Sequence, residues 1–233
     1  MIYTFCKVCL VLFLSFVIYA CSPETTSNPN VITIDSTVKP KVGSYYNYTK
    51  NYYDSLNINK GIVDIFDSVI ASGLSYKGKT NVIKVVSSNK NGKDTNYYNF
   101  ESNGNISFYE DNTLDYQEWI TYPLNGNDSI PLTVKDTSYL IGNNDTIFLK
   151  TSGYFKNIGV ETKKVGFENF NSQKLLGKKF EQYISFGDTL NITYDYIINF
   201  SRKLGAQVFY SEKNDDKRQF RYELVLDNYS LSK

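Results

Sequence analysis

The stretch Asn191–Phe200 reads NITYDYIINF, and its alternation indicates the fold class. Its even-numbered residues from Ile192 to Ile198 are aromatic or aliphatic, whereas the odd-numbered ones include Thr193 and Asp195. Successive side chains of a strand point to opposite faces of a sheet. The stretch therefore predicts a strand with one face toward the core and the other toward water.

The same period of two recurs from Lys41 onward, broken by Asn, Gly and Asp turns. It predicts strands at 42–54, 62–71, 81–87, 95–101, 105–110, 114–124, 130–136, 146–155, 158–167, 178–186, 190–200, 206–212 and 219–227. Asn171–Leu176 is expected to form a short helical turn, and no longer window has a helical apolar stripe. We predict a mainly β protein with little helix, built as a single antiparallel curled sheet or half-barrel. A closed up-and-down barrel is the alternative.

The N-terminal residues have the features of an export signal. One charge, Lys7, precedes an uncharged run over Val8–Tyr19 that is shorter than the about 20 residues of a membrane-spanning helix. The segment Ile18–Cys21 resembles the lipobox that lipoprotein signal peptidase reads. We predict a lipoprotein signal peptide over residues 1–20 and lipidation of Cys21, which would be the contact with the membrane. An ordinary secretory signal and an uncleaved anchor are the alternatives.

The remainder divides into two parts. Residues 21–40 are rich in Ser, Thr, Asn and Pro and are predicted to be a flexible tether. Residues 41–233 are predicted to be a single β-rich domain. After cleavage Cys21 would be the last cysteine and would be acylated, so the mature chain would have neither a free thiol nor a disulfide.

The composition excludes several kinds of chemistry. The chain has 0 His, which removes Ser-His-Asp and Cys-His nucleophile systems and histidine metal sites. Its 25 basic and 24 acidic residues give no electrostatic reason to expect a nucleic acid as partner. We predict no cofactor, no metal site and no catalytic residues. Paired carboxylates, as in glycosidases, remain open.

Three segments resemble a group of outer-membrane lipoproteins of Bacteroidota. They are KVGSYYNY at Lys41–Tyr48, the strand, glycine turn and strand over Tyr194–Val208, and YELV at Tyr222–Val225. Such proteins are similar to the curled half-barrels of the lipoprotein carriers LolA and LolB. The resemblance implies that fold and an outer-membrane or periplasm-facing location, or the cell surface. It implies no activity, because one fold hosts many functions.

A short motif, Asp followed by Ser or Thr, recurs before an aliphatic residue or Thr. It resembles the acceptor motif for O-glycosylation in Bacteroidota. The alternative is a turn in which Asp closes the loop before a strand begins. The candidate acceptors are Ser36, Ser55, Ser68, Ser129, Thr146 and Thr189.

Aromatic residues on predicted strands are the candidate ligand contacts. Aromatic faces in a concave site could stack on sugars or hold acyl chains, although such side chains more often form the core. The candidates are Tyr46, Tyr48, Tyr194, Tyr196 and Trp119.

We therefore expect a membrane-anchored, non-enzymatic lipoprotein whose β domain binds a ligand or partner, with a hydrophobic or glycan ligand. The first alternative is a periplasmic carrier of lipid or lipoprotein acyl chains, which would need an apolar cavity. The second is a carboxylate-dependent hydrolase of glycans, which would need two carboxylates in one cleft.

Overall fold

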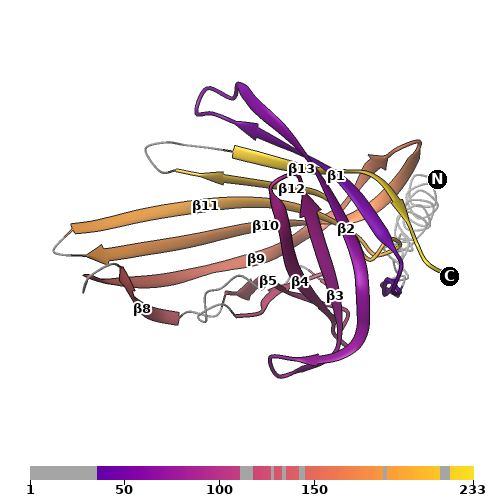
Figure 1. Ribbon diagram of the computed structural model, residues 1–233, viewed down its shortest axis with the longest axis horizontal. Coiled ribbons are helices and arrows are strands. Elements are labelled where there is room, and N and C mark those ends of the chain that lie inside the picture. Colours follow the sequence, from indigo (N-terminus) through magenta and orange to yellow (C-terminus); the bar gives the residue numbers. More distant parts are fainter. Residues whose placement is uncertain are drawn as a thin grey trace, which may run out of the picture. The chain divides into compact units, whose positions relative to one another are not determined.

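Antiparallel strands form nearly all of the chain that the computed structural model describes, which is residues 36–110, 118–126, 129–132, 135–141, 145–185, 188–215 and 221–233 (Figure 1). These residues contain no helix, and so no helix among them is long and apolar enough to span a membrane. The strands are β1 (Tyr45–Tyr53), β2 (Asn59–Tyr76), β3 (Lys79–Asn89), β4 (Gly92–Phe100), β5 (Ile106–Glu110), β6 (Ile120–Tyr122), β7 (Ser129–Pro131), β8 (Lys135–Ile141), β9 (Asp145–Val165), β10 (Glu168–Ser185), β11 (Asp188–Ser201), β12 (Ala206–Asn214) and β13 (Arg221–Ser230).

All the strands belong to one sheet with the order β6-β5-β4-β3-β2-β1-β13-β12-β11-β10-β9-β7, and β8 pairs with β9. The first and last strands, β1 and β13, pair in the middle of this order. The sheet curls until β6 comes close to β9, where Tyr122 and Phe155 have ring centroids 5.0 Å apart. The predicted antiparallel curled sheet is therefore confirmed, and it is nearly closed into a barrel.

The core lies inside the curl and follows the predicted alternation. Tyr196, Ile198 and Phe200 of β11 are buried, whereas Asp195 and Ile197 between them are exposed. Burying such side chains contributes about 1.5 to 3 kcal/mol each relative to leaving them in water. The face that the sequence pattern assigned to the core is thus the interior face of the sheet.

Tight turns join neighbouring strands where the sequence places glycine. Tyr76 pairs with Lys79 across Lys77 and Gly78, both of which have positive φ, as a two-residue hairpin requires. The β4–β5 hairpin turns over Ser102–Gly104, and Gly104 has a φ of 83°. Both turns fall between strands that the sequence pattern predicts, 62–71 and 81–87 for the first and 95–101 and 105–110 for the second.

Two local predictions are wrong. Asn171–Leu176 is not a helical turn but part of β10, because its backbone pairs with β9 on one side and β11 begins to pair on the other. The predicted strands 146–155 and 158–167 are one strand, β9, with a bulge at Ile158. Asn157 Oδ1 accepts a hydrogen bond from the Gly159 amide at this bulge, so the break in pattern is a bulge rather than a turn.

Parts of other predictions lie outside the described residues. The leader, Cys21 and most of the tether do, so the predicted division of the chain stays a prediction. Of the predicted strand 114–124, Ile120–Tyr122 is a strand, the flanking residues 118–119 and 123–124 are not, and residues 114–117 lie outside the described residues.

The segment before β1 packs on the turn between β11 and β12. The Val38 amide donates to the Arg202 carbonyl at 2.8 Å, and Arg202 Nη1 donates to Thr37 Oγ1 at 2.9 Å. Arg202 Nη2 also donates to the Leu124 carbonyl at 2.5 Å. Arg202 is only 8% exposed. It therefore ties together three segments that are far apart in the sequence.

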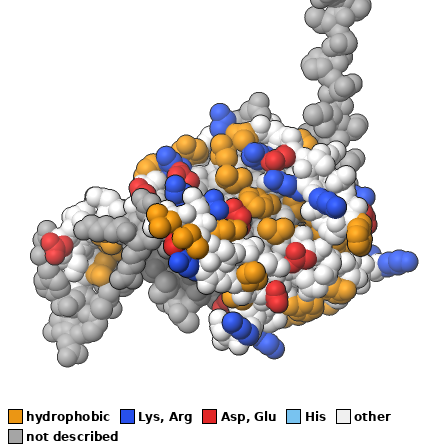
Figure 2. All heavy atoms as spheres, turned by 90° about the horizontal axis from the view of Figure 1, so that it is seen from above, with side chains coloured by type: hydrophobic (Ala, Val, Ile, Leu, Met, Phe, Trp, Pro, Cys, Tyr) orange, Lys and Arg blue, Asp and Glu red, His pale blue; other side chains and the backbone are white. Residues whose placement is uncertain are grey.

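The outer surface mixes apolar and charged side chains. On the face shown in Figure 2, hydrophobic groups lie scattered among lysine, arginine and acidic groups. Exposed apolar side chains include Leu176, Phe180 and Ile197. Lys178 lies between Leu176 and Phe180 on the same strand. Single exposed hydrophobic residues are common on soluble domains.

Candidate functional site

A cavity of about 390 Å³ lies within the curl of the sheet. It is lined by residues from both halves of the sheet, including β1 to β6 on one side and β9 to β13 on the other. Its lining combines tyrosine and aliphatic side chains with six charged ones. The charged residues are Lys50, Asp67, Asp94, Glu110, Lys179 and Glu212.

Six aromatic rings form a chain of contacts around this cavity, which we call the aromatic belt. Successive ring centroids are 6.2, 5.6, 6.1, 5.5 and 5.0 Å apart. These spacings are typical of favourable aromatic pairs, each worth about 0.5 to 1.5 kcal/mol beyond burial. In order along the belt, the residues are Tyr52 (β1), Tyr222 (β13), Tyr210 (β12), Tyr196 (β11), Phe155 (β9) and Tyr122 (β6).

Gly177 of β10 makes room for one member of the belt. Gly177 pairs with Phe155 on one side and Tyr196 on the other, so β10 contributes no ring at this level. A Cβ atom at residue 177 would clash with the Phe155 ring. The glycine thus lets the Phe155 ring lie over β10 and reach Tyr196.

Carboxylates lie next to the belt. Glu212 Oε2 accepts hydrogen bonds from the hydroxyls of Tyr210 at 2.8 Å and Tyr222 at 3.0 Å. Two further carboxylates lie on β4 and β5. Glu110 of β5 pairs with Asn96 of β4, and Asp94 lies two residues before Asn96, on the same face of β4. Burial raises the pKa of Glu110, the negative charges of Asp94 and Glu212 raise it further, and the positive charges of Lys50 and Lys179 oppose this. Asp94 and Glu212 therefore repel the negative charge of Glu110.

Two lysines of the cavity lie on tyrosine rings. Lys50 Nζ is 3.9 Å from the centroid of Tyr222, and Lys179 Nζ is 4.3 Å from that of Tyr194. Lys179 also forms an ion pair of 3.0 Å with Glu181. Both ammonium groups are held by the electron-rich faces of tyrosines, as cation–π contacts allow.

Asp67 of β2 lies among apolar and tyrosine side chains of the cavity wall. It accepts a hydrogen bond of 2.5 Å from Ser87 Oγ, which in turn accepts one of 2.9 Å from Asn96 Nδ2. Burial raises the pKa of Asp67 to about 6, although the bond from Ser87 opposes this. Burial, with the Asp67 charge, also raises the pKa values of the Tyr48 and Tyr98 hydroxyls.

The structure brings four of the five predicted aromatic candidates to the interior. Tyr46 is core, with its hydroxyl donating to the Leu204 carbonyl at 2.8 Å. Tyr48 and Tyr196 line the cavity, and Tyr194 stacks against Tyr196 with centroids 6.3 Å apart. Trp119 lies elsewhere.

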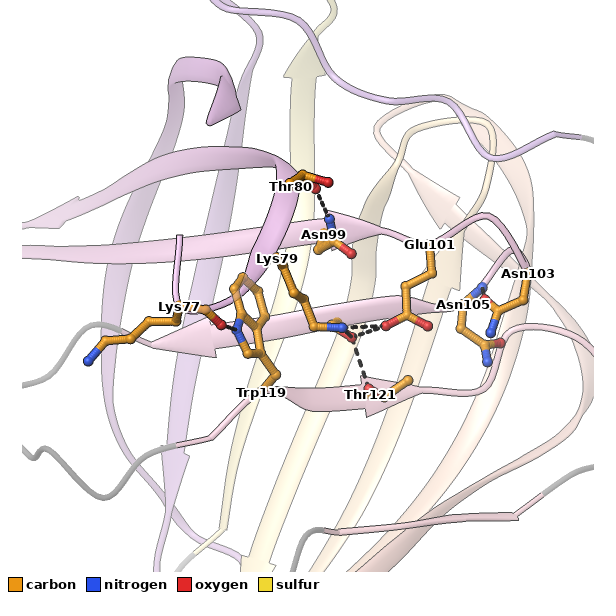
Figure 3. A network of polar contacts seen from close by, with 10 residues as sticks. Lys77, Lys79, Thr80, Asn99, Glu101, Asn103, Asn105, Trp119 and Thr121 are labelled. Carbon is orange, nitrogen blue, oxygen red and sulfur yellow. Dashed lines mark hydrogen bonds and ion pairs between the residues drawn. The ribbon is translucent and has the colours of Figure 1, made fainter. Parts of the chain in front are cut away.

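Trp119 packs on the outer face of the sheet, against Tyr109 and Tyr76. Its indole Nε1 donates to the Lys77 carbonyl at 3.1 Å (Figure 3). In the same figure Lys79 Nζ approaches Glu101 Oε1 at 2.6 Å. These contacts join the β2–β3 hairpin to β4, β5 and the residues before β6, and they give Trp119 a packing role.

The candidate glycosylation sites differ in exposure. The exposed ones are Ser36, Ser55, Ser129 and Thr189. Ser68 and Thr146 are partly buried within β2 and β9, and Ser68 has β1 on one side and β3 on the other. Glycosylation at any of these residues and lipidation at Cys21 stay predictions.

The charged residues of the cavity were missed by the reading of the sequence, although a signal exists. Lys50 and Asp67 lie at positions of their strands whose side chains point toward the core. Tyr48, two residues before Lys50, and Val69, two residues after Asp67, are both buried. A charge at such a position is costly unless it is solvated or paired, so it marks a cavity or a site. Among the described residues, no three His, Cys, Asp or Glu side chains gather to hold a metal ion.

No family model and no curated protein matches the chain. Two solved structures are similar to the chain. One is a predicted lipoprotein of Parabacteroides distasonis, with a TM-score of 0.49 and 12% identity, covering 84% of this chain and 100% of the other. The second is a predicted exported protein of Bacteroides fragilis with a YmcC-like fold, with a TM-score of 0.40 and 12% identity, covering 84% and 99%. Both organisms belong to the Bacteroidota. Similarity at this level carries no function to this chain.

Proposed function

We propose that this protein is a lipid-anchored binding protein of the bacterial envelope, whose curled-sheet domain holds a small polar ligand in its cavity without converting it. The observation that carries the proposal is the cavity of about 390 Å³, lined both by the aromatic belt and by charged side chains. Ligand sites typically combine an apolar wall with a few polar groups that orient the ligand. Aromatic faces together with carboxylates suit a hydroxylated or charged molecule.

The charged lining argues against the carrier of acyl chains. An acyl chain in this cavity would lie beside Glu110, Glu212 and Lys50, and it would displace water that solvates them. The carrier alternative needs an apolar cavity, and this lining does not supply one.

Native mass spectrometry tests the proposal directly. The full chain is released from membranes with a nonionic detergent, and its mass is compared with that of the denatured chain. We expect a bound polar molecule, in near one-to-one ratio, that is released on unfolding. A co-purified lipid in that ratio would instead support the carrier. An unliganded chain that also fails to bind any member of a panel of sugars and amines would contradict the proposal.

Anchoring is tested separately, because it rests on the sequence of the leader alone. The expected result is that an alkyne-labelled fatty acid is incorporated into the wild-type chain, which then sediments with membranes. Cys21→Ser should abolish both the label and the sedimentation. A labelled Cys21→Ser chain would show that the lipid, if any, is elsewhere.

A hydrolase is the second candidate, and one observation favours it. Glu110 has a raised pKa in a cavity that also contains Asp94 and Glu212, and a carboxyl with a raised pKa is suited to act as a general acid. The test is release of reducing ends from oligosaccharides by the purified protein. Turnover that is lost in both Glu110→Gln and Asp94→Asn would establish the hydrolase. Binding without turnover supports the binding protein.

A further inference from the structure

The cavity has an excess of negative charge that its own lysines do not balance. Its described lining carries four carboxylates, Asp67, Asp94, Glu110 and Glu212, against the two ammonium groups of Lys50 and Lys179. Lys179 is already paired with Glu181, at 3.0 Å. The field in the cavity therefore favours a cation over a neutral or anionic molecule.

Two of the carboxylates, both of them exposed, form no hydrogen bond or ion pair with another described residue. No hydrogen bond or ion pair from that part of the chain reaches Asp94 or Glu110, whereas Asp67 accepts a bond from Ser87, and Glu212 accepts two from tyrosines. Asp94 and Glu110 lie on neighbouring strands and on the same face. Side chains placed diagonally in this way are about 7 to 8 Å apart at their backbones, so a single ammonium group can reach both.

A tyrosine hydroxyl also faces the cavity without a protein partner among the described residues. Tyr196 is 7% exposed and lines the cavity, and no described residue lies in hydrogen-bond contact with its hydroxyl. The hydroxyl is not one of the fully buried polar atoms of the described residues, so it remains accessible from the cavity. A ligand with a hydroxyl or an ether oxygen could bond to it.

The cavity already stabilises ammonium groups of its own. Lys50 lies over Tyr222 and Lys179 over Tyr194, each within the range of a cation–π contact. The tyrosine faces and the carboxylates thus form an environment that accepts a primary ammonium. Asp94 and Glu110 on β4 and β5 add two carboxylates to this environment, and Lys50 and Lys179 are close enough to act electrostatically on Glu110.

We propose that the ligand of this cavity carries a primary ammonium group, which Asp94 and Glu110 bind while the remainder of the molecule lies against the aromatic belt and Tyr196. This inference rests on the proposed function, because it names the chemical class of the ligand at the same site. An amino sugar and a polyamine share the ammonium group, and only the amino sugar offers hydroxyls to Tyr196.

Isothermal titration calorimetry on the full chain in a nonionic detergent separates these classes. The probes are the disaccharide of glucosamine, its N-acetylated counterpart of the same shape without charge, and spermidine. We expect the glucosamine disaccharide to bind at least about tenfold more tightly than the acetylated one, because the acetyl group removes the charge that Asp94 and Glu110 bind. Its affinity should fall as salt is raised.

Three variants assign the contacts. Glu110→Gln should weaken binding of either amine about tenfold. Asp195→Asn is the matched control, because Asp195 lies on the outer face with a side chain 60% exposed and loses the same charge. Tyr196→Phe keeps the ring and should weaken the disaccharide but not spermidine. Equal melting temperatures would show that the variants are folded.

Each outcome is decisive. Tighter binding of the amine, lost in Glu110→Gln and kept in Asp195→Asn, supports the inference, and the ratio of disaccharide to spermidine affinity identifies the source of the amine. If the acetylated disaccharide binds as well as the free amine, the inference fails while the proposed function stands. If the amine binds equally to Glu110→Gln and wild type, the assigned contact is wrong. If no probe binds, the inference fails, and mass spectrometry then decides the proposed function.

Discussion

The ring of Tyr122 on β6 meets the ring of Phe155 on β9 edge-to-face, with centroids 5.0 Å apart and planes at 82°. Tyr122 belongs to the terminal strand at one end of the sheet order, and Phe155 lies on β9, next to the terminal strand β7 at the other end. No backbone ladder joins β6 to β9 in the described residues. Side-chain packing rather than hydrogen bonding therefore brings the ends together at this point.

Removing the Phe155 ring should open this closure. Phe155→Ala is expected to lower the free energy of unfolding by about 3 kcal/mol, because Phe155 is buried and contacts both Tyr122 and Tyr196. Urea unfolding followed by circular dichroism measures the change. Phe180→Ala is the control, since Phe180 is 44% exposed, and it should cost less than about 1 kcal/mol.

Gly177 gives a sharper form of the same prediction. Gly177→Ala should destabilise the wild type because its methyl group would clash with the Phe155 ring, but it should be nearly neutral in the Phe155→Ala background. Equal costs in the two backgrounds would show that the glycine serves another purpose.

The stability of the domain should depend on pH through Asp67. Its pKa is raised to about 6 from the ordinary value of 3.8, so the folded state binds the proton more tightly than the unfolded chain. The stabilisation by this proton is complete below pH 3.8 and is lost as the pH rises through about 6. Asp67→Asn, which can still accept the bond from Ser87, should therefore be more stable than wild type by about 1 to 2 kcal/mol at pH 8.

Thermal unfolding at pH 4 and pH 8 checks this sign. The difference between Asp67→Asn and wild type should shrink toward zero at pH 4, where Asp67 is protonated in the folded state. A variant that is less stable than wild type at pH 8 would mean that ionised Asp67 is compensated in the cavity.

The absence of a side chain at Gly205 should be needed for the segment before β1 to pack against the turn between β11 and β12. Its φ is 63°, and a Cβ atom there would clash with the Val38 carbonyl oxygen. Gly205→Ala should cost about 2 kcal/mol and should increase hydrogen exchange at the Val38 amide, which donates to Arg202. Gly78→Ala is the matched control, because Gly78 has a φ of 80° and open space around it. Similar exchange at Val38 in both variants would show that backbone strain alone is responsible.

If the chain is O-glycosylated, exposure should select the acceptors. Ser36 and Ser55 are exposed, whereas Ser68 lies in β2 between two paired strands. Peptide mass spectrometry of the chain from its native host should therefore find glycan on one or more of the exposed residues, which are Ser36, Ser55, Ser129 and Thr189, and none on Ser68. A modified Ser68 would mean that the glycan is added before the strand pairs.

Much of the fold could be predicted because its signals are local. Alternation within Asn191–Phe200 places Tyr194 and Tyr196 on the core side whatever the rest of the chain does. Gly78 and Gly104 indicate turns because glycine accepts positive φ, which both residues have in the structure. The conformation of Asn171–Leu176 could not be predicted from local signals. Its composition allows a turn, but the ladders on either side of β10 satisfy its backbone as a strand.

The amino-acid sequence by itself thus determined the strand class, the turns and which side chains share a face. Only the tertiary structure decided that the sheet curls until Tyr122 meets Phe155, that Trp119 lies outside, and that Glu110 faces Glu212 across a cavity. The physical reason is that the backbone geometry of adjacent residues alone makes successive side chains of a strand point to opposite faces of the sheet. The approach of β6 to β9 depends on the summed twist and curl of all the strands between them.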